Sequence, residues 1–343
     1  MVEFDLAAIS VFRKNFFEIE KSLISRKDER TMLKIYKTDV AGKINEIDQF
    51  EKGYWINLTA PSNDELKEVS QLCSIPMEFL EDPLDLEESA RIQYDEETSC
   101  TLIINDFPII DVNNHQFDSY ITIPIGIIIG KDYIVTVCSQ STNFLENLIK
   151  KNVNTSMKIR FALEILLSIS TQYIEKLKLL NKQRLKIESN LRDSLTNKQL
   201  YDLMEIEKSL VYFLTSLKAN ADVVTKLFRT KSIKLYEEDK DLLEDVKIEN
   251  NQGIETTELY TRILNSITGS YSSLISNELN KTMKTLTLFT VFLTLPTLVF
   301  SFFGMNVILP IDDKDPFSWI ITLIIALILV IWIGLALWRK RIF

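Results

Sequence analysis

Hydrophobic positions near the end of the chain form two long uninterrupted stretches. Residues 285–311 include no charged residue, and after a short acidic run residues 316–338 again include none. About 20 apolar residues, at about 1.5 Å each in a helix, span a hydrocarbon layer of about 30 Å. The sequence therefore predicts a membrane protein with two C-terminal transmembrane helices, which cover residues 286–303 and 319–338.

The middle of the chain has the pattern of long helices. Residues 125–295 include no proline, and apolar residues between 157 and 232 recur at helical spacing among many Lys and Glu. Because proline interrupts a helix, this stretch favours long unbroken helices with one solvated face. We predict an antiparallel helix pair over residues 151–235 and a long stalk helix over 236–303 that continues into the first span.

Residues 1–150 differ from the rest of the chain. Short β-branched runs between turn residues predict strands, and helical periodicity predicts two helices. The predicted strands are 54–58, 100–104, 121–129 and 133–137, and the predicted helices are 63–73 and 77–86. The predicted fold class is therefore an α+β cytoplasmic domain followed by long helices and two C-terminal transmembrane helices.

Composition and charge exclude several functions. The 343 residues include 39 Lys and Arg against 48 Asp and Glu, and the formal net charge of −9 disfavours nucleic acid as a partner. Three distant cysteines (73, 100 and 138) and a single histidine fit neither a disulfide framework nor a Cys/His zinc site, so we interpret the cysteines as buried thiols. Residues 126–131 resemble a phosphate-binding loop with one residue too few between the glycines, which favours a strand that ends in a tight turn.

Charges beside the spans predict the orientation of the chain in a cell membrane. The first residues lack a basic segment followed by an apolar core, so we expect no cleaved signal. Basic residues flank the two spans, whereas the loop between them, residues 304–318, carries one lysine. The positive-inside rule then places both termini, including the basic tail 339–343, in the cytoplasm and the loop outside. The flanking basic residues are Lys281, Lys284, Arg339, Lys340 and Arg341.

Polar side chains follow one stripe of the first predicted span. Seven residues fall at alternating steps of three and four, which places them on one helix face, and we call them the polar seam. Ser and Thr in membranes often bond back to their own helix, which is one explanation. The other, which we favour, is a water-filled axis formed by several copies of this helix. The seam consists of Asn280, Met283, Thr287, Thr290, Thr294, Thr297 and Ser301.

The chemistry of the seam indicates a hydrated cation. The seam carries no charge, and magnesium usually keeps several of its waters, which uncharged oxygens can bind without removing them. The span ends at Gly304, Met305 and Asn306, where the glycine allows a close backbone turn and the amide offers a carbonyl oxygen. Taken alone, these three residues are also compatible with a helix C-cap in which the glycine is left-handed.

The sequence resembles the CorA-type magnesium channels. Residues 303–306, Phe-Gly-Met-Asn, are similar to that family's Tyr-Gly-Met-Asn signature and lie between the two spans. Residues 280–287 match the family's Asn-x-x-Met-Lys-x-Leu-Thr run, and residues 296–297 match its Pro-Thr step. Residues 55–58, 80–82 and 91–92 resemble the family's cytoplasmic domain, so the resemblance covers nearly the whole chain.

The resemblance implies a funnel-shaped homopentamer in which the first span lines the pore and the second surrounds it. It further implies magnesium uptake driven by the membrane potential, gated by cytoplasmic magnesium, with no organic cofactor and no enzymatic activity. Met283 and Leu286 would form a hydrophobic gate. Carried over by position, the selectivity filter is Gly304, Met305 and Asn306, and the pore lining is Asn280, Met283, Leu286, Thr287, Thr290, Thr294, Thr297 and Ser301.

The resemblance also implies a regulatory magnesium site. Asp82 and Asp245 fall where the family places paired carboxylates that bind magnesium across neighbouring cytoplasmic domains. Acidic residues are common in this chain, and Asp82 next to Pro83 is equally compatible with a turn or cap residue.

Three departures from the family pattern bear on the pore and the domain. Residues 307–310, Val-Ile-Leu-Pro, replace a frequent Met-Pro-Glu-Leu, so the acidic run 312–315 is the candidate for attracting cations. Arg91 lacks the proline that often follows it. Ser301 replaces a common glycine and Thr294 a methionine, which predicts a more polar pore midway.

Other functions remain as alternatives. Transport of cobalt, nickel or zinc is possible within the same superfamily, although zinc favours softer ligands and His115 lies far from the spans. A membrane-anchored helical scaffold would leave the polar seam and Asn306 without a purpose. A membrane hydrolase lacks a Ser/His or metal-ligand constellation. Membrane lipid, divalent cations and further copies of the chain are therefore the expected partners.

Overall fold

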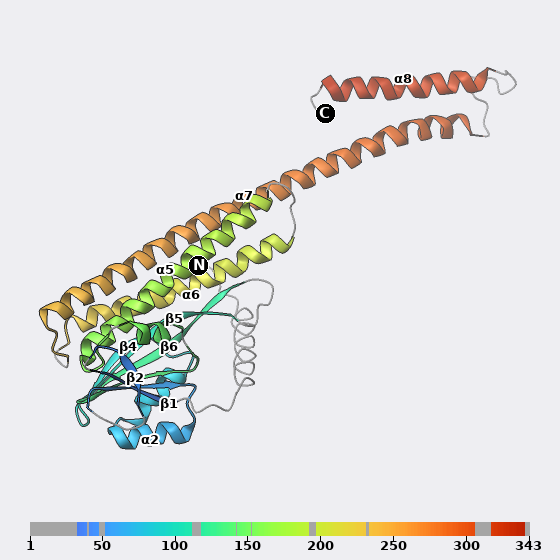
Figure 1. Ribbon diagram of the computed structural model, residues 1–343. Helices are drawn as coiled ribbons and strands as arrows, with labels where there is room; N and C mark the ends of the chain where they lie inside the picture. Colours follow the sequence, from blue (N-terminus) through green and yellow to red (C-terminus); the bar gives the residue numbers. More distant parts are fainter. Residues whose placement is uncertain are drawn as a thin grey trace. The chain divides into compact units, whose positions relative to one another are not determined.

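The computed structural model describes residues 33–39, 41–47, 52–111, 118–141, 143–151, 153–191, 197–230, 233–305 and 317–339. The chain divides into two compact units, Met1–Ile267 and Thr268–Phe343. The first unit contains a seven-stranded sheet with helices on both faces, and the second contains two apolar helix segments (Figure 1).

The sheet of the first unit has the strand order β2-β1-β3-β7-β6-β5-β4. Neighbouring strands are antiparallel except β3 and β7, which are parallel. All four strands predicted from β-branched runs are confirmed, and β1, β2 and β4 are additional. The strands are β1 (Leu33–Thr38), β2 (Ile44–Glu46), β3 (Tyr54–Thr59), β4 (Arg91–Asp95), β5 (Cys100–Ile110), β6 (Tyr120–Ile129) and β7 (Tyr133–Cys138).

Alternating side chains of the central strands build a separate hydrophobic core on each face of the sheet. In β3, Trp55 belongs to one core and Ile56 to the other, and both are fully buried. The first core includes helices α4 (Asn143–Lys150), α5 (Lys158–Leu191) and α6 (Asn197–Leu227), and the second includes α2 (Asn63–Cys73) and α3 (Met77–Glu81). The three cysteines are free and buried, as predicted.

The two predicted helices of the α+β domain are present, with one correction. α2 begins with a capping box in which Ser62 and Glu65 exchange hydrogen bonds, which explains its sharp start. The helix predicted over 77–86 is shorter, because α3 ends at Glu81 and a 3₁₀ turn, η1 (Asp82–Leu84), follows. Pro83 has no N–H to continue the α-helical hydrogen bonds.

The long helix α7 (Glu237–Phe303) is unbroken, which confirms the predicted continuity into the first span. Its first part packs on α6 through two close contacts. Asn250 Nδ2 donates to the Leu217 carbonyl at 2.9 Å, and a methyl group at Gly253 would stand 3.1 Å from a Leu217 methyl. Gly253 therefore allows α7 to approach α6 closely.

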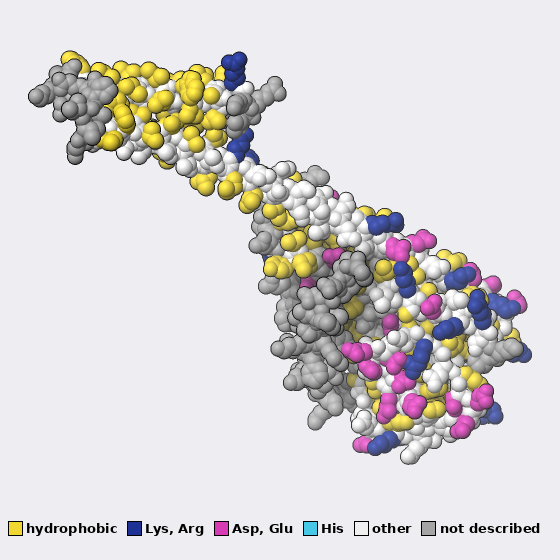
Figure 2. Space-filling model, turned by 180° about the vertical axis from the view of Figure 1, so that it is seen from behind, with side chains coloured by type: hydrophobic (Ala, Val, Ile, Leu, Met, Phe, Trp, Pro, Cys, Tyr) yellow, Lys and Arg dark blue, Asp and Glu magenta, His cyan; other side chains and the backbone are white. Residues whose placement is uncertain are grey.

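The second unit contains the end of α7 and helix α8 (Ser318–Arg339). In the part of the chain that the structure describes, two helices are long and apolar enough to cross a membrane: α7, and α8 from Trp319 to Arg339. Apolar side chains gather on the end of α7 and on α8, whereas the surface of the first unit mixes acidic and basic side chains (Figure 2). The charged surface of the first unit is suited to water, and the apolar surface of the second unit is suited to lipid.

Candidate ion pathway and acid pair

The polar seam lies on the uncovered side of α7. All seven seam residues are exposed in the single chain, and so is Leu286 of the predicted gate. Two residues along a helix correspond to a rotation of about 200°, so a residue two positions from a seam residue lies on nearly the opposite side of α7. On that opposite side Val299 is only 5% exposed, and the Phe292 ring lies 3.8 Å from where a methyl group at Gly334 of α8 would stand. α8 therefore contacts the side of α7 that faces away from the seam.

The threonine hydroxyls of the seam bond back to their own helix. The Oγ1 atom of Thr287 donates to the Met283 carbonyl at 2.7 Å, and that of Thr297 donates to the Leu293 carbonyl at 2.8 Å. Thr290 and Thr294 do the same, as does Thr285, which lies off the seam. Back-bonding therefore occurs both on and off the seam. It does not explain why the polar residues are aligned on one face of the helix.

This hydrogen bonding has a chemical consequence for the seam. Each of these threonine hydroxyls uses its only proton toward the helix, so the oxygen lone pairs remain as acceptors. The waters around a cation point their hydrogens outward and donate to such acceptors. The seam is therefore suited to a hydrated cation and contributes no positive charge that would attract an anion.

The end of α7 corrects one interpretation of the Gly-Met-Asn signature. The Gly304 amide donates to the Phe300 carbonyl at 2.9 Å, so the glycine continues the last helical turn. Gly42 and Gly53 are the glycines with positive φ in the described residues, and Gly304 is therefore not a left-handed cap. A side chain at Gly304 would approach the Phe300 carbonyl oxygen to 3.0 Å, which favours glycine there for reasons of space.

Several residues predicted from the sequence lie outside the described residues. They include Asn306 of the predicted selectivity filter, and nothing is inferred about its geometry. The others are His115, the acidic run 312–315 and the basic residues Lys340 and Arg341.

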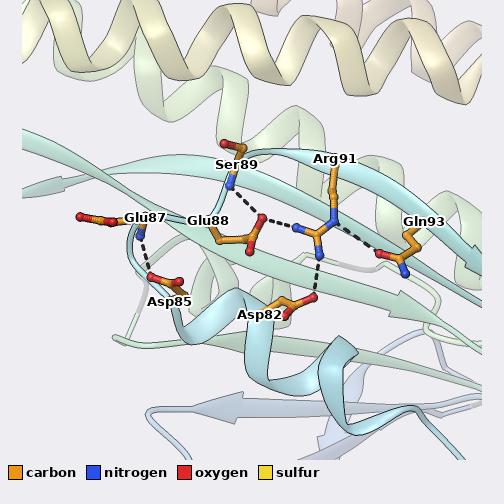
Figure 3. Close-up of polar contacts among 7 residues, drawn as sticks. All are labelled: Asp82, Asp85, Glu87, Glu88, Ser89, Arg91 and Gln93. Carbon is orange, nitrogen blue, oxygen red and sulfur yellow. Dashed lines mark hydrogen bonds and ion pairs between the residues drawn. The ribbon is translucent and has the colours of Figure 1, made fainter.

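Asp82 of the predicted acid pair already has a cationic partner (Figure 3). Its Oδ2 atom accepts from Nη2 of Arg91 at 2.6 Å, and both side chains are 29% exposed. Arg91 also pairs with Glu88. The sequence analysis did not predict this ion pair within the chain.

Asp245 lies on α7 and is exposed. Among the described residues, no group of three or more His, Cys, Asp or Glu side chains is arranged to hold a metal ion. The pairing of Asp82 with Asp245 of another copy stays a prediction.

The sequence analysis missed the polar side chains that join the helices to the sheet. Asn220 of α6 accepts from the Asp106 amide and donates to the Asp106 carbonyl, each at 2.9 Å. Burial raises the pKa of the Asp106 carboxyl to about 6, an effect that a hydrogen bond from Ser216 partly offsets. An asparagine on the helix face that the apolar spacing predicts to be buried is the signal that could have identified this contact.

Comparison with known proteins supplies an independent observation. The chain matches the family described as "CorA-like Mg2+ transporter protein" over residues 50–341. It is 27% identical over 304 residues to the cobalt/magnesium transport protein CorA of Methanocaldococcus jannaschii, which covers 86% of this chain and 93% of the relative. It is 25% identical over 260 residues to the magnesium transport protein CorA of Wolinella succinogenes, which covers 74% of this chain and 79% of the relative.

Solved structures share the fold. The complete structure of the CorA magnesium transporter from Methanocaldococcus jannaschii superimposes with a TM-score of 0.75 at 24% identity, over 92% of this chain and 99% of that one. The structure of the full-length CmaX protein gives a TM-score of 0.68 at 14% identity, over 91% of this chain and 99% of that one.

Proposed function

The chain belongs to the family of CorA-like Mg2+ transporter proteins, and from this premise we propose that it forms a divalent-cation channel for magnesium uptake. The observation that carries the proposal is the polar seam of α7. The seam is exposed along its whole length, faces away from α8 and leads to the Gly-Met-Asn signature. A purely structural anchor in lipid has no need of such a seam.

The channel is a homo-oligomer, and the family resemblance makes it a homopentamer. One copy presents one seam, so a closed ring of copies is needed to surround an axis with polar oxygens. In this ring Met283 and Leu286 form the narrow hydrophobic gate, Thr297 and Ser301 form polar rings, and Asn306 contributes an amide at the outer mouth. Hydrophobic constrictions of this kind gate by loss of water.

Magnesium is the preferred cargo because acceptor oxygens bind its water shell without stripping it. The relative from Methanocaldococcus jannaschii is named a cobalt/magnesium transport protein, so cobalt is the first competitor to test. The membrane potential drives uptake of the cation, and cytoplasmic magnesium inhibits it through Asp82 and Asp245. Both termini lie in the cytoplasm of a cell whose membrane the two helices cross.

The deciding experiment measures magnesium flux into liposomes that contain the full-length protein. We expect Asn306→Ala to abolish uptake while the oligomer stays assembled, because alanine offers no acceptor to the ion's waters. Asn147→Ala is the matched control, since Asn147 is an exposed asparagine on α4 of the first unit, outside the candidate membrane spans. Unchanged uptake in the Asn306 variant would contradict the assignment of the filter.

The same liposomes test the ion. Cobalt, nickel and zinc are added in turn at equal concentration, and each is compared with magnesium. We expect magnesium to give the largest flux and zinc the smallest, because the seam has none of the Cys, His, Asp or Glu side chains that bind zinc in proteins. A larger flux of zinc than of magnesium would support the alternative that the protein is a zinc transporter.

A further inference from the structure

Arg91 lies between two carboxylates that come from different segments of the first unit. Its Nη2 atom donates to Asp82 in η1, and its Nη1 atom donates to Glu88 in the loop before β4. Its Nε atom reaches Oε1 of Gln93 at 3.4 Å, so all three guanidinium nitrogens are engaged. Figure 3 shows the guanidinium group in the middle of this arrangement.

The loop that carries Glu88 is held in shape by its own hydrogen bonds. The Ser89 amide donates to Oε1 of Glu88 at 3.1 Å, and the Glu87 amide donates to Oδ1 of Asp85 at 3.0 Å. The Glu87 side chain points away from Arg91 (Figure 3). Glu88 is therefore directed at Arg91, while its neighbour in sequence is not.

The charges of this cluster do not cancel. One guanidinium faces two carboxylates, and the side chains of Asp82, Glu88 and Arg91 are all less than a third exposed. Partial burial makes the attraction stronger than that of a surface pair. Without the guanidinium, the two carboxylates would repel each other and attract a divalent cation.

We propose that Arg91 is a built-in cation that competes with divalent cations for Asp82 and so sets the concentration at which they bind there. The inference rests on the proposed function, in which Asp82 takes part in inhibition by magnesium. Binding at Asp82 is then an exchange of one cation for another. A divalent cation must displace the guanidinium, which raises the concentration needed for half-saturation.

The first test replaces Arg91 in the full-length protein. We measure the magnesium concentration that half-protects the cytoplasmic unit from protease and the concentration that half-inhibits the current. Arg91→Gln is expected to lower both midpoints at least about tenfold, because the competitor is gone. Arg160→Gln is the control, since it removes the same charge from an exposed pair with Glu238, and it should shift the midpoints less than about twofold.

An unchanged midpoint in Arg91→Gln overturns the inference. In the background of Asp82→Asn, Arg91→Gln should not change the magnesium midpoints further. A fall of the midpoints in this double variant would also overturn the inference, because the competition would then lie at another carboxylate. Wild-type magnesium uptake is recorded in the same preparations. Absent uptake contradicts the proposed function, whereas normal uptake with an unchanged midpoint contradicts the competition alone.

The second test leaves Arg91 in place and applies even where the Arg91 variant does not assemble. In Glu88→Gln the guanidinium pairs with Asp82 alone and competes more strongly, so both magnesium midpoints should rise. The rise should be at least about threefold larger than in Glu87→Gln. Glu87→Gln removes the same charge from the same loop without touching Arg91. Equal shifts in the two variants would show a general effect of charge and would overturn the inference.

Discussion

The two parts of α7 are one helix built for two surroundings. In residues 237–267 several apolar side chains pack against the same unit, with Leu243 fully buried, and most acids and lysines are exposed. In residues 268–303 most of the large apolar side chains are exposed, with Leu293 71% exposed, and Tyr271 and Val299 are the buried ones. The first part is completed by its own chain, whereas the second requires lipid and further copies of the protein.

The difference also separates two uses of polar side chains within the helix. In the first part, Asn250 is buried and its amide bonds α6, so its polarity serves packing. In the second part, the seam threonines are exposed, and their hydroxyls donate to carbonyls of the same helix. Polarity that is not used for packing in a membrane segment indicates function.

The largest expected effect is on conduction. Thr297→Leu should lower magnesium uptake at least about tenfold, because a ring of leucines at this level excludes water from the axis. Thr285→Leu is the matched control, since Thr285 has the same back-bond but lies off the seam. Uptake is measured in liposomes, and equal losses in both variants would show that the seam does not line the pathway.

The second expected effect is on stability. Leu243→Ala should destabilise the first unit by about 2–5 kcal/mol, since it leaves a cavity in a core. Leu293→Ala should cost less than about 1 kcal/mol, because lipid is as apolar as the leucine it contacts. Hydrogen exchange of the α7 amides in lipid measures both. A large loss at Leu293 would mean that another copy of the protein, rather than lipid, covers this side chain.

Strong local patterns account for the parts of the fold that could be predicted. The strands β5, β6 and β7 are nearly continuous runs of buried apolar residues, and α2 begins with a capping box. The edge strand β4 was missed because its side chains are half-buried or exposed and carry no clear pattern. The end of α3 was misplaced because the effect of Pro83 was not weighed against the apolar periodicity.

The candidate site divides in the same way. The seam was predictable, because helical spacing alone decides which residues share a face. The pairing of Asp82 with Arg91 was not, because it depends on how η1 meets the edge of the sheet. A local pattern cannot reveal an ion pair that tertiary structure creates between a turn and a strand nine positions later.

The smallest expected effect compares the two glycines of α7. Alanine is favoured over glycine in a helix by about 1 kcal/mol, so Gly269→Ala, which meets no atom within 4 Å, should stabilise the helix by about that amount. At Gly253 the new methyl group would stand 3.1 Å from a methyl of Leu217, whose residue is fully buried and whose carbonyl is held by Asn250. Leu217 has little room to move, so Gly253→Ala should be destabilising by about 1 kcal/mol instead.

Hydrogen exchange of the amides around each glycine measures whether the substitution stabilises or destabilises the helix there. The cause is checked by adding Leu217→Ala, which removes the methyl groups that the new side chain meets. In that background Gly253→Ala should become stabilising, as at Gly269, because only helix propensity remains. Stabilisation by Gly253→Ala in the otherwise unchanged protein would mean that α6 does not hold α7 at this point, and that the first part of α7 is less closely packed than its buried side chains indicate.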